Sequence, residues 1–400
     1  MLNTCDEIRD FCRMTESYNR ENRRREVREA WNGLADMWRN GEIRRDAFSI
    51  RRIFEESVPG GHNIVREFAD RNRSGSGVFY EAGVGVNTAH FANIIGQISF
   101  AEVLQAMEQP AFIAMDLVSK RPAITGEQEV LPGVTMLGDV AGDIGEGEVY
   151  PEAGVGEDYT VMPKKIKEGF VVSVTEETVF EDKTGLILER ARSGAESIAI
   201  SQEKDGLNTA LGVTTSWKRK SNAAVATYND VVAATHNFDN LSASTALTNH
   251  DSIATAENLL YAMVDLNTGE PITFPLDMQI VFPHQLRTTA HWILNSSQVT
   301  RLTASDTLRA LAPNPVGQVG PKYTPKSNQY VTTITGSATT WFIGAFQKAF
   351  EYAEIWPTQL FVEDRNSAAG FANDVIFRSK VRRKGAFGVR NPQFVVKCTA

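Results

Sequence analysis

The stretch EGEVYPEAGVGEDYTVMPKKIKEGFVVSVTEETVFED, residues 146–182, decides the fold that we expect for this chain. Its first half is rich in Gly, Pro and acidic residues and has no helical period, which predicts a long β-hairpin-like excursion over residues 126–167. Such a segment has little apolar material of its own to bury. A loop of this length is typically functional or docked on something else.

Charge is segregated along this hairpin. Acidic residues fill the part from Asp139 to Asp158, which has no basic residue, and lysines then arrive together. This segregation indicates that the hairpin docks on another protein. The residues predicted to make that contact are Asp139, Asp143, Glu146, Glu148, Glu152, Glu157, Asp158, Lys164, Lys165 and Lys167.

The second half of the quoted stretch begins a mixed helix and strand pattern. We expect a short strand at 170–172, a capping box formed by Ser173 and Glu176, and then a long helix with a stripe of small residues. Gly194 in that helix costs about 1 kcal/mol relative to Ala. A helix capped by Asp251 or Ser252, a buried strand at 278–282 and another helix follow, which predicts an α+β or α/β domain with a small central sheet.

The C-terminal part is mostly strand, predicted at 330–334, 341–346, 350–356, 359–362, 375–381 and 394–397. The strand at 375–381 is apolar on one face and basic on the other, so its open face tolerates solvent or an acidic partner. Little aromatic interleaving in the sequence argues against DNA and favours an acidic protein segment as the partner. The predicted basic partner surface consists of Arg378, Lys380, Arg382, Arg383, Lys384 and Arg390.

Composition excludes several classes of protein. The 400 residues carry a net charge of −8 with a pI near 5.5, which argues against a protein that mainly neutralises phosphates. The three cysteines, Cys5, Cys12 and Cys398, have no paired spacing, which indicates reduced thiols in the cytosol. We expect no secretory signal and no membrane span.

Motifs for catalysis or metal binding do not occur in the sequence. The six histidines form no zinc pattern, the acids of the hairpin do not match a calcium loop, and no GxSxG motif is present. We therefore predict no enzyme activity, no cofactor and no metal.

The order of these segments is similar to that of a known family. Residues 146–182 followed by an Ala-rich helix, and the closing residues GAFGVRNPQFVVKC at 385–398, resemble the major capsid protein of tailed bacteriophages. The resemblance covers roughly residues 80–400. It implies an α+β, Hong Kong 97-type capsid fold with an extended N-terminal helical arm, a long β-hairpin loop, a peripheral domain with a spine helix, and an axial domain.

The resemblance also implies a division of the chain. The expected parts are a charged, scaffold-like helical segment or arm at 1–75, an N-terminal arm and helix at 76–125, the hairpin at 126–167, the peripheral domain at 168–250, the axial domain at 251–360, and closing strands of the peripheral domain at 361–400.

The function implied is self-assembly into an icosahedral shell of pentamers and hexamers that encloses double-stranded DNA. The acidic net charge fits weak, non-specific contact with that DNA. The implied partners are further copies of the chain, a portal protein and a scaffold or decoration protein, with no membrane. The implied location is the virion capsid, assembled in the host bacterial cytoplasm.

Three other interpretations stay open at this point. The first is an encapsulin-like nanocompartment shell, although the scaffold-like segment and the long hairpin favour a phage shell. The second is a soluble α+β enzyme with an unrecognised site. The third is a phage tail or decoration protein, which we expect to be richer in strands.

Overall fold

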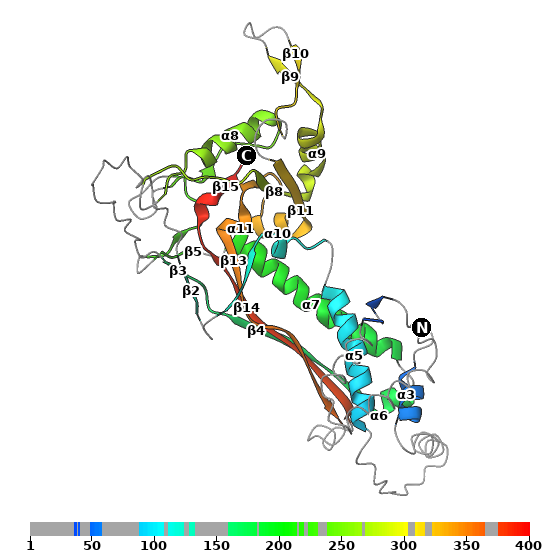
Figure 1. Cartoon of the computed structure of the whole chain (residues 1–400). Helices are drawn as coiled ribbons and strands as arrows, with labels where there is room; N and C mark the ends of the chain where they lie inside the picture. The colour runs from blue at the N-terminus through cyan, green and yellow to red at the C-terminus, as the bar shows by residue number, and fades with distance from the viewer. Residues whose placement is uncertain are drawn as a thin grey trace, which may run out of the picture. The chain divides into compact units, whose positions relative to one another are not determined.

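A computed structural model gives the fold of the chain (Figure 1). It describes residues 36–37, 39–40, 49–57, 88–107, 111–123, 128–132, 159–181, 184–213, 216–219, 223–230, 238–265, 269–302, 309–316, 322–364 and 375–400. The chain forms two compact units. The first comprises residues 1–109, 167–200 and 356–383, and the second comprises residues 110–166, 201–355 and 384–400.

The first unit combines long strands with helices. Its strands come from β4 (Ile166–Thr175), β13 (Phe350–Asp364) and β14 (Val375–Val389), with β14 in the middle. Its helices are α3 (Ile50–Ser57), α5 (Thr88–Met107), α6 (Glu176–Phe180) and the first part of α7 (Thr184–Ala210). Figure 1 shows α5 and α7 running beside these strands.

Two glycines let the helices of the first unit lie directly on the sheet. A Cβ atom on Gly96 of α5 would lie 2.7 Å from Val362, and one on Gly194 of α7 would lie 2.8 Å from the Phe170 ring. Gly194 therefore has a packing reason that outweighs its low helix propensity. Buried apolar residues from the helices and from β4 and β14 form one core here, including Ile53, Ile95, Val172, Ala195 and Phe377.

The second unit is built on a five-stranded sheet. The strand order is β11 (Lys322–Asn328), β8 (Asp277–Pro283), β12 (Trp341–Gly344), β15 (Val395–Cys398) and β7 (Leu241–Ser242). The outer pairs β11–β8 and β15–β7 are parallel, whereas β12 is antiparallel to both of its neighbours. The helices of this unit are α8 (His250–Tyr261), α9 (Arg287–Asn295), α10 (Gln329–Thr335) and α11 (Phe346–Ala349).

Short elements complete the second unit. The described part of this unit has three 3-10 turns: η2 (Ala114–Asp116), η3 (His284–Leu286) and η4 (Pro392–Phe394). The small strands are β1 (Ser119–Pro122), β2 (Val130–Pro132), β3 (Tyr159–Val161), β5 (Ser216–Trp217), β6 (Val225–Ala226), β9 (Gln298–Leu302) and β10 (Arg309–Pro313). β1 runs parallel to the first residues of β13, and β2–β3, β5–β6 and β9–β10 are antiparallel pairs.

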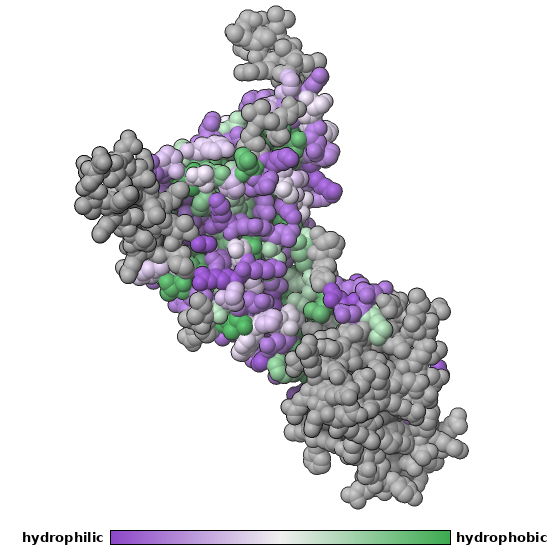
Figure 2. Space-filling model, in the orientation of Figure 1, coloured by the Kyte–Doolittle hydropathy of each residue, from purple (hydrophilic) through white to green (hydrophobic). Residues whose placement is uncertain are grey.

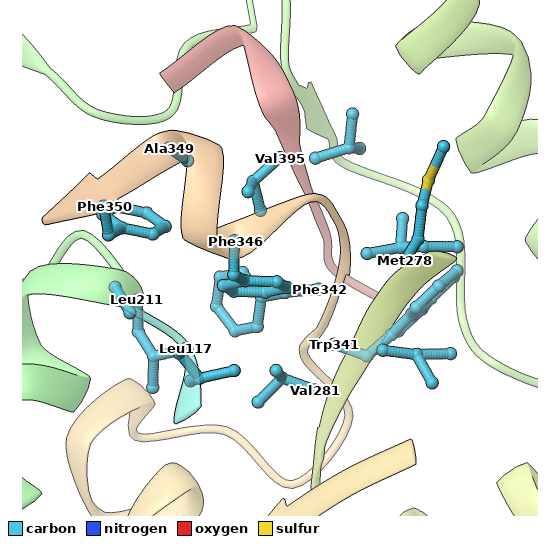
Figure 3. Packing of buried hydrophobic residues seen from close by; sticks show 14 of the residues in the cluster. Leu117, Leu211, Met278, Val281, Trp341, Phe342, Phe346, Ala349, Phe350 and Val395 are labelled. Atoms are coloured by element: carbon cyan, nitrogen blue, oxygen red, sulfur yellow. The ribbon is translucent and has the colours of Figure 1, made fainter. Parts of the chain in front are cut away.

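Aromatic residues dominate the core of the second unit (Figure 3). Trp341, Phe342, Phe346 and Phe350 are each 0% exposed. Figure 3 shows Phe342 and Phe346 at the centre of the cluster, between leucines on one side and Trp341 on the other. The buried Trp341 indole donates a hydrogen bond to the backbone oxygen of Thr245, at 2.8 Å.

The sequence-based expectations for individual elements hold in part. The strand at 278–282 and the long helix are confirmed, and the expected strands 350–356 and 359–362 are one strand, β13. The expected strand at 330–334 is wrong, because this segment is α10. The structure divides the expected peripheral segment 168–250 after residue 200 and places 201–250 in the second unit.

Both expected helix caps are also wrong. The residue before α6 is Thr175, and Ser173 lies within β4. α8 is capped by Asn249, whose side chain accepts a hydrogen bond from the Ser252 amide at 3.2 Å. Asn249 precedes both predicted capping residues, so the helix begins earlier than the sequence pattern indicated.

Candidate assembly surfaces

The ends of the predicted hairpin are fixed to the second unit. β2 and β3 pair antiparallel, and the Met162 amide donates to the Glu129 backbone oxygen at 2.9 Å. Leu131 and Met162 are 0% and 1% exposed and pack against Ala353 at the start of β13. The two ends of the segment 133–158, at β2 and β3, are therefore held side by side in the second unit.

A buried ion pair ties the same place together. The Lys165 ammonium lies 2.7 Å from a carboxylate oxygen of Glu129, and the two side chains are 0% and 3% exposed. Two buried opposite charges compensate each other only when they stay in contact. This pair therefore joins the strand entering the hairpin to the segment leaving it.

The structure separates the predicted hairpin residues into three groups. Residues 139–158, which include all the predicted acids, lie outside the described residues. Lys164 and Lys167 are exposed. Lys165 is enclosed by its own chain and pairs with Glu129, so its ammonium is not available to a neighbouring copy.

Most of the predicted basic residues have partners in their own unit. In the first unit, Arg378 pairs with Glu363 at 3.2 Å, and buried Arg383 forms an ion pair with Glu168. In the second unit, Arg390 lies 3.9 Å from Glu351, and Lys384 is half-buried. Arg383 is thus a structural residue on the helix-covered side, because side chains alternate along β14.

Lys380 and Arg382 are placed differently. The Arg382 guanidinium carbon lies 4.4 Å from the ring centroid of Trp356 and 4.3 Å from that of Phe361. The Lys380 ammonium lies 5.2 Å from the Phe361 centroid. The basic strand itself has little aromatic interleaving, as its sequence indicates, and the two rings beside its cations come from β13.

These side chains define one surface of the first unit, the open sheet face. We use this name for Lys167, Val171, Trp356, Phe361, Arg378, Lys380 and Arg382. A cavity of ≈ 350 Å³ lies in it, lined by Val171, Phe361, Val362, Glu363, Arg378 and Lys380. Beside this cavity β4 lies so close to β14 that a Cβ atom on Gly169 would lie 2.5 Å from the Val381 backbone oxygen.

A buried carboxylate connects three elements of the second unit. Glu203 on α7 accepts hydrogen bonds from the Ile113 and Ala114 amides, both at 2.9 Å, and from the Asn328 side chain at 2.7 Å. Burial raises the pKa of Glu203, and the hydrogen bonds that it accepts oppose this rise only in part. The sequence reasoning missed this junction, since its members lie far apart in the chain.

The described residues offer little for catalysis. In the described ranges, no group of three or more His, Cys, Asp or Glu residues is arranged to hold a metal ion. Burial raises the pKa of the Cys398 thiol to about 12, so this cysteine is not a nucleophile at neutral pH. Within that same part of the chain, no helix has the length and apolarity needed to cross a membrane.

Comparison with known proteins defines the class. The family model described as phage capsid protein matches residues 158–398, which is more than half of the chain. The chain therefore belongs to this family of phage capsid proteins. A search of curated proteins finds no match.

Solved structures with a similar chain path include several capsids. The capsid of the cyanophage P-SCSP1u is 11% identical, with 72% of this chain and 88% of that chain covered and a TM-score of 0.43. A Gordonia phage Cozz structure is 15% identical, with coverages of 81% and 99% and a TM-score of 0.40. A virus-like particle from Pyrococcus furiosus is 9% identical, with coverages of 75% and 98% and a TM-score of 0.40.

Family membership confirms the resemblance on which the expected function depends. The protein is a structural, major capsid protein with an α+β fold, and its copies assemble into the shell of a virion. The Hong Kong 97-type arrangement is consistent with this result. The match favours a phage shell over the nanocompartment, the soluble enzyme and the tail protein.

Proposed function

We propose that the chain forms an icosahedral shell of pentamers and hexamers around the double-stranded DNA of a tailed phage, with the hairpin as the link between copies. The observation that carries the proposal is the fixed base of the hairpin, where Lys165 and Glu129 are in contact at 2.7 Å. Because both ends of the segment are held in this way, a contact that it makes with a neighbour is fixed to the second unit.

The rest of the hairpin supplies the contact. The segment 139–158 carries seven acids and no basic residue, so it gains little by folding on itself. We assign its acids, together with exposed Lys164 and Lys167, to the interface with a second copy.

The expected division of the chain serves this assembly. In the proposal, residues 1–75 are a scaffold-like segment or arm and 76–109 a further arm and helix, while 167–200 and 356–383 of the first unit build the peripheral domain and 201–355 of the second unit the axial domain. Large apolar side chains support a contact role for the last of these: Tyr261, Leu276 and Trp292 are 52%, 75% and 67% exposed. Figure 2 shows apolar residues scattered among polar ones on the visible face of the second unit.

Weak contacts suffice for such a shell. A single contact of about 4 kcal/mol corresponds to millimolar affinity, and several contacts per subunit become cooperative through effective concentration. Weakness also permits misplaced subunits to leave. Closure into a shell instead of a filament depends on fixed angles between the contacts.

Other partners follow from the shell. A portal protein occupies one vertex, a scaffold or decoration protein assists assembly, and DNA touches the inner wall only weakly because the net charge of the chain is −8. Assembly takes place in the host bacterial cytoplasm, without a membrane.

Electron microscopy of the purified protein, expressed alone or with its scaffold, tests the proposal. We expect closed particles of uniform diameter. Reversing four charges together, by Glu146→Lys, Glu148→Lys, Glu152→Lys and Glu157→Lys, should block assembly and leave the circular dichroism of the subunit unchanged. Normal shells from this variant would refute the role of the hairpin, and a monodisperse monomer from the unaltered chain would refute the function.

A further inference from the structure

We propose that Arg121 and Arg390 of the second unit, on either side of the buried Glu351 carboxylate, form a binding site for a phosphate group. Such a site goes beyond the proposed function, because its ligand is an anion and not another copy of the chain.

The two arginines approach one carboxylate from different strands. Arg121 lies on β1, Glu351 lies near the start of β13, and Arg390 directly follows β14. A terminal nitrogen of Arg121 lies 3.6 Å from one Glu351 oxygen, and a terminal nitrogen of Arg390 lies 3.9 Å from the other. Two positive charges therefore flank one negative charge, which leaves the cluster with an excess of positive charge.

Glu351 holds the arginines in place without using all of their donors. Its side chain is 4% exposed, whereas those of Arg121 and Arg390 are 31% and 32% exposed and open to an anion from solvent. Both nitrogen–oxygen distances exceed the roughly 2.7–3.2 Å of an N–H···O hydrogen bond. Because a guanidinium carries several N–H donors, most of them stay available to a further acceptor.

Arg390 also has a donor that lacks an acceptor. Its Nε atom is buried and has no hydrogen-bond partner among the described residues. A buried N–H group without an acceptor destabilises a folded chain. An anion seated between the two guanidinium groups supplies this arginine with the acceptor that it lacks.

The backbone around the site is fixed before an anion arrives. The Arg390 amide donates to the Ala349 backbone oxygen at 2.8 Å, and the Arg390 backbone oxygen accepts a hydrogen bond from the Trp217 indole at 3.4 Å. Arg121 is in register with Ala353 in the parallel pair of β1 and β13. Groups that are held in position in this way lose less conformational freedom on binding, which favours affinity.

The arrangement of the donors favours phosphate over other anions. One guanidinium satisfies both oxygens of a carboxylate, so two guanidinium groups match an anion with more than two oxygens. Chloride has no pair of oxygens for the planar arginine side chain to bind. The exposed Glu354 does not oppose the anion, because side chains alternate along β13 and place it on the opposite face from Glu351.

The phosphate group has two possible sources with the same oxygens, which are the free ion and the backbone of DNA. The proposed shell encloses double-stranded DNA, so the second source would give each copy one contact with it. A single phosphate contact adds little to the salt dependence of binding, which fits weak contact between DNA and an acidic chain.

Calorimetric titration with sodium phosphate at constant ionic strength tests the site. The full chain is used at a concentration where sedimentation shows single copies. We expect saturable binding of one phosphate per chain. Arg121→Gln and Arg390→Gln should each weaken this binding by about tenfold or more, because each removes charge-assisted hydrogen bonds.

Two further variants separate loss of the site from loss of folding. Arg121→Lys keeps a positive charge beside Glu351, so the circular dichroism should be unchanged, yet phosphate binding should weaken several-fold because lysine lacks the planar donor pair. Arg192→Gln is the matched control and should leave the affinity unchanged. Arg192 is an exposed arginine of the first unit whose Nε already donates to Glu196 at 3.2 Å.

A short DNA duplex distinguishes the two sources. If the backbone phosphate is the ligand, free phosphate should compete with the duplex, and Arg390→Gln should reduce the slope of log affinity against log salt by about one. If the free ion is the ligand, the same variant should weaken phosphate binding and leave the duplex affinity unchanged. Either result supports the site.

Two other results would overturn it. The first is that the unaltered chain binds neither phosphate nor the duplex. The second is equal affinity for both probes in the unaltered chain, Arg121→Gln and Arg390→Gln. Neither assay needs a closed shell, so failure of the site and failure of the proposed function are distinguishable.

Discussion

Replacing Lys165 by methionine should loosen the base of the hairpin. Methionine keeps an unbranched side chain of similar length but removes the ammonium that lies 2.7 Å from Glu129. The Glu129 carboxylate, whose side chain is 3% exposed, then remains buried without that partner. We expect the hairpin base to open more often and shell assembly to fall.

The size of the effect follows from burial. Removing one member of a buried ion pair typically costs about 3–5 kcal/mol, because the remaining charge is uncompensated. Since about 1.4 kcal/mol corresponds to a factor of ten, the opening equilibrium of β2 and β3 should rise by a hundredfold or more. Lys164→Met is the matched control, because Lys164 is exposed and such changes usually stay within about 0.5 kcal/mol.

Hydrogen exchange followed by mass spectrometry measures this opening directly. The peptide to follow contains Met162, whose amide donates to the Glu129 backbone oxygen at 2.9 Å. Adding Glu129→Leu to Lys165→Met should restore most of the lost protection, because an apolar pair replaces the ionic one. Equal protection in Lys165→Met and Lys164→Met would refute the buried pair and the fixed hairpin base.

Three further predictions concern the two compact units. Glu203→Gln should lower the unfolding free energy by about 1–3 kcal/mol, because the amide directs a donor at one of the N–H groups around the site, and denaturant titration measures this loss. Burial raises the pKa of Glu203 in the folded chain, so the ionised carboxylate destabilises the protein fully at a pH above this raised pKa. This destabilisation should disappear as the pH falls from the pKa of the folded chain to the lower pKa of the unfolded chain. The Gln variant should lose this pH dependence. In the same helix, Gly185→Ala has no atom within 4 Å of the new Cβ and should stabilise the protein by up to about 1 kcal/mol. Gly194→Ala should give no such gain, because its Cβ would lie 2.8 Å from Phe170. Equal gains of the two variants in thermal unfolding would contradict the packing of α7 on Phe170. Cys398, which is 0% exposed and has a pKa raised to about 12, should resist alkylation in the native protein and react only on unfolding, as mass spectrometry of its peptide would show.

Local sequence signals predicted the elements whose patterns are long and periodic. The helix α7 and the strand β8 follow from runs of apolar residues, whose spacing is a property of the chain alone. The segment 330–334 was predicted as a strand because its β-branched residues favour that structure. Asn328 caps the first turn there and Gly336 ends the helix with φ 65°, and these two caps decide in favour of α10.

The candidate surfaces were predictable in charge but not in detail. The acidic and basic runs are visible in the sequence, because each lies within one segment. The contact between Lys165 and Glu129 joins residues 36 positions apart, and the rings that hold Arg382 come from a different strand. Such pairings depend on strand register, which no short sequence window contains.

The most direct test of the central claim is a cryo-electron microscopy map of the assembled particle, with density traced through residues 133–158. We expect a closed shell in which this segment of each copy lies against an adjacent copy. A shell in which the segment lies against the copy that carries it would refute the role of the hairpin as the link between copies.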